Sequence, residues 1–134
     1  MRLDGNRVAT YRTWEKAVDA DAPSHLIMAT GVGGVLYFPG CFHSDIEKEE
    51  LFMELCPTND DIWFKFMALL NGTACAVARR VSRYDEDIVL DQAKIGDLGR
   101  INVGMNANDV QIQRVVDYYK LEVQDIFRSA VDAS

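Results

Sequence analysis

Long apolar runs, paired cysteines and an excess of positive charge are all missing from this sequence of 134 residues. Its longest uncharged stretch, residues 22–44, contains two prolines and four glycines, so it does not predict a membrane-spanning helix of roughly 20 apolar residues. A formal net charge of -7 repels phosphate groups, and we therefore predict no nucleic-acid partner. Because the amino terminus lacks the apolar segment of a secretion signal, we expect a cytoplasmic location, including the inner face of the membrane.

Cysteine and histidine are scarce in the chain. The three cysteines, at positions 41, 56 and 75, form no CxxC pair, and only His25 and His43 could supplement them. Zinc sites use closely spaced ligands, so the sequence predicts reduced, mostly buried thiols and no metal or other cofactor in this chain alone. Apolar residues make up 49% of the chain, which predicts one domain over residues 1–134, with residues 1–22 as a loosely structured leading segment.

Three short runs have the character of strands. They are β-branched, aromatic or alternating in polarity and are bounded by glycine or proline, and they span Leu26–Ala29, Val35–Phe38 and Cys75–Val81. Interleaved with helices, they predict an α/β or α+β fold in which about three helices cover a small mixed sheet. Residues 84–104 show no clean period and predict a long irregular stretch, a candidate lid.

Three helices are predicted from caps and apolar spacing. The first begins at the capping box of Ser44–Glu47. The second begins after Thr58 and Asn59, carries a thick apolar face, and stops at Asn71-Gly72. The third opens at residues 106–109 and keeps its apolar spacing as far as Phe127.

Asp60 and Asp61, at the start of the second predicted helix, are the sharpest candidates for chemistry. Adjacent carboxylates at the mouth of a cleft can accept a proton and bind hydroxyl groups, but acids in a first helical turn also simply complement the helix dipole. Trp63 could hold the apolar face of a sugar ring beside these acids, or it could fill the core. The residues themselves leave both interpretations open.

His43 and an arginine group are weaker candidates. His43 follows a Pro-Gly turn and could act as a base or ligand, or could cap the helix that follows. Arg79, Arg80 and Arg83 could clamp a diphosphate, although on an alternating strand two of them would face solvent. The glycines of residues 31–34 lack the GxGxxG spacing and open no helix, so no dinucleotide site is predicted.

Several of these motifs follow one another in a definite order. The stretch TGVGGVLYFPG (residues 30–40) precedes His43, an acidic helix, CPTNDDIWFK (56–65) and LNG (70–72). A later helix then carries Asn102, Asn108, Asp109, Gln111, Val115 and Tyr118. Over residues 11–127 this order resembles the carboxyl-terminal half of bacterial glycosyltransferases of the GT-A type, which use nucleotide sugars and often build capsule or other cell-surface polysaccharide. The chain departs from that pattern at Phe38 and Asn59, where the family has proline and alanine.

The resemblance implies a nucleotide-diphospho-sugar fold with a saccharide acceptor and a nucleotide-sugar donor. Asp60 or Asp61 would be the general base for the acceptor hydroxyl, and the loop from Gly31 to Gly34, with Gly33 and Gly34 as substrate-binding residues, would line the acceptor side of the cleft. With these residues we group Trp63 and His43 as candidate substrate-binding residues.

The donor half of such an enzyme is missing from the pattern. That half carries a DxD motif for Mg²⁺ or Mn²⁺, whereas Asp19 and Asp21 have the spacing but follow polar sequence. We therefore expect a partial transferase that is inactive alone, binds metal only where a donor half is supplied, and self-associates or pairs with a donor-binding chain. The alternative is a non-catalytic carbohydrate-binding or interaction module.

Overall fold

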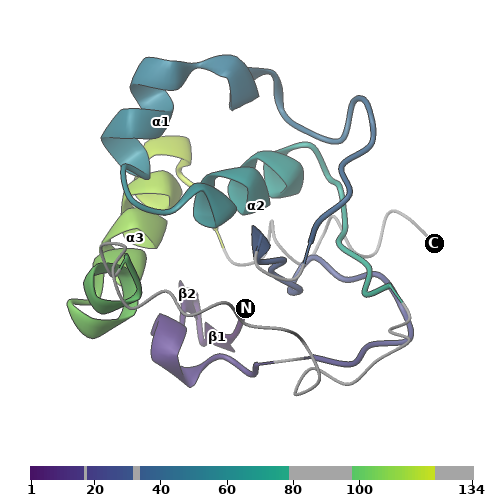
Figure 1. Cartoon of the computed structure of the whole chain (residues 1–134), viewed down its shortest axis with the longest axis horizontal. Helices are drawn as coiled ribbons and strands as arrows, with labels where there is room; N and C mark the ends of the chain where they lie inside the picture. Colours follow the sequence, from purple (N-terminus) through teal and green to yellow (C-terminus); the bar gives the residue numbers. More distant parts are fainter. Residues whose placement is uncertain (17, 32–33, 79–97, 123–134) are drawn as a thin grey trace, which may run out of the picture.

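The computed structural model describes residues 1–16, 18–31, 34–78 and 98–122 (Figure 1). Two short strands and a series of helices follow one another along the chain. In order they are β1 (Leu3–Asp4), β2 (Arg7–Val8), the 3-10 helices η1 (Tyr11–Thr13) and η3 (Ser44–Glu47), α1 (Glu49–Leu55), α2 (Asp60–Leu70), the π-helical turn η5 (Arg100–Gly104) and α3 (Ala107–Tyr119).

The leading segment contains the only sheet among the described residues. β1 and β2 pair antiparallel, with Leu3 opposite Val8, and Gly5 supplies the positive φ of +57° that the tight turn between them requires. Trp14 is buried a few residues later, and its indole N–H donates to the carbonyl of Ala9 at 2.8 Å. Residues 1–16 are therefore attached to the core through a hairpin and an aromatic anchor.

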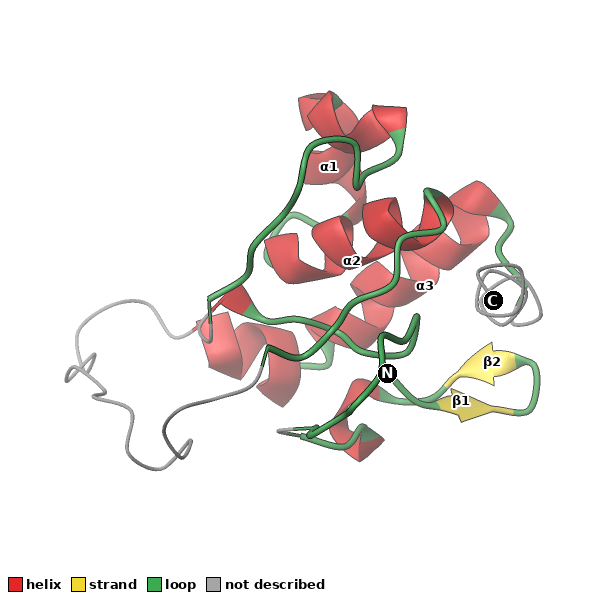
Figure 2. Ribbon diagram, turned by 90° about the vertical axis from the view of Figure 1, so that its right-hand side faces the viewer, coloured by secondary structure: helices red, strands yellow, loops and turns green. Residues whose placement is uncertain are grey.

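Helix α2 is the most buried element that the structure describes, as its apolar composition predicts. Asn59 caps its amino terminus by accepting the N–H of Ile62 at 3.3 Å, and Gly72 ends it with a φ of +71°. α2 and α3 lie side by side in both views (Figures 1 and 2). The core is formed by apolar side chains of α1, α2 and α3 together with Trp14, namely Leu55, Cys56, Ile62, Trp63, Phe66, Met67, Leu69, Ile112 and Val115.

The first predicted helix begins differently from its capping box. Residues 44–47 form the 3-10 helix η3, and α1 begins only at Glu49. The cap is His43 rather than Ser44, because its Nδ1 accepts the N–H of Asp45 at 3.3 Å. The carboxylate of Asp45 in turn accepts the hydroxyl of Tyr119 at 2.9 Å and pairs with Lys48 at 2.9 Å, which holds η3 against α3.

The strands predicted at Leu26–Ala29 and Val35–Phe38 are wrong, since neither run is a strand in the structure. Of the third, only Cys75 makes a bridge, an isolated one with Ser24, and residues 79–81 lie outside the described residues. The fold is coarsely α+β, with a two-stranded hairpin in place of the small mixed sheet that we expected.

Side chains of α2 take the place of a β-ladder along residues 25–31. The buried ammonium group of Lys65 donates to the carbonyls of His25 at 2.5 Å and Ile27 at 2.8 Å. One helical turn earlier, Asp61 Oδ1 accepts the N–H of Gly31 at 2.9 Å. Backbone groups that a strand would satisfy with a neighbouring strand are thus satisfied by a helix.

The last predicted helix is confirmed as α3, but it ends at Tyr119. Lys120 adopts the left-handed conformation with a φ of +52°, and the N–H of Leu121 returns to the carbonyl of Val116 at 3.0 Å, which closes the helix. The extension to Phe127 and residues 84–97 of the candidate lid lie outside the described residues. Within the part of the chain that the structure describes, no helix has the length and apolarity to span a bilayer.

Replacing Lys65 by Met should remove a pH dependence of stability. Burial lowers the pKa of Lys65 from 10.5 to about 8, so between those values the folded protein binds fewer protons than the unfolded chain, and the free energy of unfolding rises with pH. From pH 8 to 10, urea denaturation should show the wild type gaining on the order of 2 kcal/mol relative to Lys65→Met. If the free energies of unfolding of the two proteins changed equally with pH, the lowered pKa of Lys65 would be contradicted.

Candidate functional site

The two acids at the start of α2 have different environments. Asp60 is exposed, and its Oδ1 accepts the N–H of Asp61 at 3.1 Å. Asp61 is half-buried, and its Oδ1 accepts the N–H of Gly31 at 2.9 Å. No other described residue donates a hydrogen bond to the Asp61 carboxylate, so its Oδ2 atom remains available to a ligand. The pair is therefore one solvated acid beside one acid turned toward the glycine-rich segment.

Burial raises the pKa of Asp61 above its ordinary value of 3.8. The neighbouring charge of Asp60 acts in the same direction, whereas the hydrogen bond from Gly31 favours the carboxylate and opposes the shift. A carboxylate whose pKa is raised is a stronger base than an ordinary aspartate. Asp61 is therefore the member of the pair that is better suited to accept a proton.

The negative charge of Asp61 acts on two tyrosines that are not among the predicted site residues, Tyr11 and Tyr37. Burial raises the pKa of both Tyr11 and Tyr37, and the negative charge of Asp61 raises each of them further. Tyr11 belongs to η1, and Tyr37 belongs to the run that was predicted as a strand. In the sequence, the only feature that set Tyr37 apart was its position shortly after the glycines. The prediction of a strand at Val35–Phe38 did not indicate which residues would surround its side chain.

The glycine-rich segment meets the acid pair through Gly31, the first glycine of the loop that the resemblance implies. A Cβ atom at Gly31 would lie 3.4 Å from Asp61 Oδ1, so the backbone approaches the carboxylate closely. Gly34 is exposed, with a φ of +77°, and its N–H donates to the carbonyl of Gly31 at 3.0 Å. Gly33 lies outside the described residues. The role of Gly33 and Gly34 in binding remains a prediction.

Trp63 is part of the core. Its exposed fraction is 2%, its indole N–H donates to the carbonyl of Ile46 at 3.3 Å, and its ring lies 5.9 Å from that of Phe52. A ring buried in this way presents no face to a sugar, so of the two interpretations in the sequence analysis the geometry favours core packing.

His43 lies at the other end of α2 from the acids. Its backbone N–H donates to the carbonyl of Met67, which is six residues, or about 9 Å, further along the helix than Asp61. Its Nδ1 accepts the N–H of Asp45 at 3.3 Å, and this hydrogen bond caps η3. His43 acts as a helix cap and is not brought together with Asp60 and Asp61.

A buried network of amides fixes the chain just before the acids. Thr58 donates its N–H to Gln111 Oε1 at 3.0 Å and its hydroxyl to Asn102 Oδ1 at 2.6 Å. Asn59 Nδ2 donates to Asn108 Oδ1 at 2.8 Å. Asn108 and Gln111 are almost fully buried. Three residues of the motif that resembles the glycosyltransferase pattern thus hold the start of α2.

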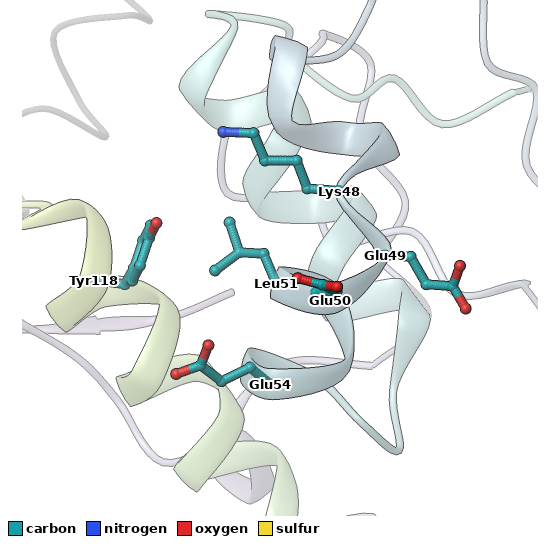
Figure 3. Close-up of a pocket in the computed structure, with 6 residues that line it drawn as sticks. All are labelled: Lys48, Glu49, Glu50, Leu51, Glu54 and Tyr118. Carbon is teal, nitrogen blue, oxygen red and sulfur yellow. The ribbon is translucent and has the colours of Figure 1, made fainter.

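A hollow of about 570 Å³ lies elsewhere, between α1 and α3 (Figure 3). It contains none of the predicted site residues, and three of the side chains around it are glutamates. The lining residues are Lys48, Glu49, Glu50, Leu51, Glu54 and Tyr118. The hollow is open and acidic, and it offers nothing that would position a substrate at Asp61.

A donor-metal site receives no support from Asp19 and Asp21. Both are exposed and lie outside any helix or strand, and within residues 1–16, 18–31, 34–78 and 98–122 no three His, Cys, Asp or Glu side chains gather closely enough to hold a metal ion.

No protein-family model, curated protein or solved structure matches this chain.

Trp63→Phe should lower stability without altering any ligand affinity of the acid pair. The smaller ring leaves a cavity in the core and removes the bond to Ile46, which should cost about 1–3 kcal/mol in the free energy of unfolding. Urea denaturation measures the first effect, and saccharide titration measures the second. A loss of saccharide affinity at unchanged stability would restore the stacking role of Trp63.

Asn59 and Asn108 should be energetically coupled. Truncating either one to Ala leaves a buried amide without its partner, so each single change should cost about 1–3 kcal/mol. The double variant leaves neither amide without its partner, although it still loses the cap that Asn59 provides to the N–H of Ile62, and it should cost less than the sum. A double-mutant cycle by urea denaturation measures the coupling, and strict additivity would show that the pair carries no interaction energy.

Proposed function

We propose that this chain is the acceptor half of a nucleotide-sugar-dependent glycosyltransferase, inactive alone, in which Asp61 is the general base. The observation that carries the proposal is the hydrogen bond from Gly31 to Asp61 Oδ1. It joins the glycine-rich segment to the acid pair, two motifs that are 30 residues apart and that the resemblance assigns to one acceptor cleft.

Asp61 has the properties that a base for a hydroxyl group needs. Gly31 holds one carboxylate oxygen in place, and partial burial together with Asp60 raises the pKa, which strengthens the base. In the reaction Asp61 Oδ2 takes the proton of the acceptor hydroxyl. The acceptor oxygen then forms the new bond to the anomeric carbon. The bond from the anomeric carbon to the diphosphate breaks, and the nucleoside diphosphate leaves with the electron pair.

The donor site belongs to a second component in this proposal. A donor-binding chain would supply the nucleotide pocket and any Mg²⁺ or Mn²⁺, which offsets the charge of the leaving diphosphate. Leu36 and Phe38 are 94% and 61% exposed, and such apolar side chains suit a contact with that chain or with a second copy. We place this activity in the cytoplasm, including the inner face of the membrane.

A carbohydrate-binding module without transfer activity is the second candidate. The acid pair itself supports it, because one exposed and one half-buried carboxylate can bind hydroxyl groups without a donor half. The same acid pair would then bind saccharide hydroxyls and perform no proton transfer. The two candidates agree on saccharide binding and differ on transfer once a donor half is present.

Asp61→Asn should weaken saccharide binding more than Asp60→Asn. With methyl β-D-pyranosides of glucose, galactose and N-acetylglucosamine as probes, NMR titration should show a loss of about fivefold to tenfold for Asp61→Asn and less than twofold for Asp60→Asn. Glu54→Gln, an exposed acid on α1, is the matched control. Asp61→Asn should be at least as stable as the wild type at pH 7, because a raised pKa means that the charged form destabilises the fold.

Three outcomes would contradict parts of this proposal. Wild-type chain that binds none of the three pyranosides would end it. Equal losses for the variants at positions 60 and 61 would remove the base assignment. Binding of UDP-glucose with Mn²⁺ to this chain alone, followed by tryptophan fluorescence, would show that the donor site lies here and not in a second component.

A further inference from the structure

Three aromatic rings, of Tyr37, Phe42 and Phe64, form a cluster. The ring of Tyr37 lies 4.8 Å from that of Phe42 and 5.3 Å from that of Phe64, and the last two are 5.6 Å apart. Phe42 and Phe64 are half-buried, whereas Tyr37 is 40% exposed. The two phenylalanines therefore support the tyrosine ring from the protein side and leave part of it open to solvent.

Helix geometry places this cluster on the side of α2 that carries the acids. Phe64 is four residues after Asp60 and three after Asp61, and residues at those spacings share one face of a helix. The charges of Asp61 and Asp60 act on the Tyr37 hydroxyl and raise its pKa, in agreement with this placement. Tyr37 is thus a partly exposed aromatic ring on the side of α2 that carries Asp61, whose Oδ2 accepts no hydrogen bond from another described residue.

This combination matches the chemistry of a pyranose ring. Such a sugar has axial C–H groups on one face, which pack against an aromatic ring, and hydroxyl groups around its edge, which donate to carboxylates. The sequence analysis assigned the aromatic role to Trp63, but that ring is 2% exposed. Among the described residues, Tyr37 has the required exposure and the required neighbour.

We propose that Tyr37 is the ring against which the acceptor sugar packs, and that it orients the sugar so that one hydroxyl meets Asp61 Oδ2. The acceptor is accordingly a pyranoside with axial hydrogens on one face. Phe42 and Phe64 are positioning residues that hold the tyrosine ring. This inference rests on the proposed function and names the acceptor class for the same site.

Variants at Tyr37 test the inference with the three methyl β-D-pyranosides used for Asp61. Tyr37→Ala should weaken binding by about fivefold or more, while Tyr37→Phe and Tyr37→Trp should stay within about twofold of the wild type, because each keeps a stacking face. The axial sugar protons should shift upfield on binding to the wild type and lose that shift with Tyr37→Ala. Tyr118→Ala, a tyrosine of α3 that is 52% exposed, is the matched control.

The outcomes separate this inference from the proposed function. If Tyr37→Ala binds the pyranosides like the wild type while Asp61→Asn does not, Tyr37 is not the stacking residue and the proposed function stands. If the wild type binds none of them, both are overturned. Should Tyr37→Ala fail to fold, Tyr37→Leu replaces it, because leucine keeps an apolar side chain but has no ring, and an upfield shift of the sugar protons that persists in Tyr37→Leu would overturn the inference.

Discussion

The described structure depends on one buried lysine side chain. Lys65 lies inside the most buried helix, and the described residues give it no carboxylate partner. Burying an ammonium group is costly unless its donors are satisfied, and here the backbone carbonyls of His25 and Ile27 satisfy them. The same contact satisfies carbonyls that have no β-ladder. α2 therefore organises the irregular chain around it through polar bonds as well as through its apolar face.

The start of α2 is held from two directions, and this makes it a plausible place for chemistry. On one side, Gly31 donates to Asp61. On the other, the buried amides of α3 and the turn before it bind Thr58 and Asn59. Acidic side chains at a helix terminus that is fixed in this way keep their geometry without packing into the core, so Asp61 can be both ordered and accessible.

The local position of the two acids could be predicted from the sequence, whereas the burial of Trp63 could not. Asp60 and Asp61 were recognised because N-capping and first-turn acids are local features that depend on adjacent residues. Trp63 was chosen for its spacing of three from Asp60, which does place neighbouring side chains on the helix surface, but the burial of Trp63 depends on the core that packs against it. Tyr37 comes from a distant segment that reaches α2 only in the folded chain, and no local pattern shows this.

The sequence by itself determined the helices, because caps, glycine stops and apolar spacing act within a few residues of one another. It placed α2 and the beginning of α3 correctly, together with the acidic character of the first turn of α2. Tertiary structure alone decided that Leu26–Ala29 and Val35–Phe38 would not be strands. An apolar run needs partners for its backbone groups, and whether they come from a strand or from side chains such as Lys65 is settled by contacts between distant segments.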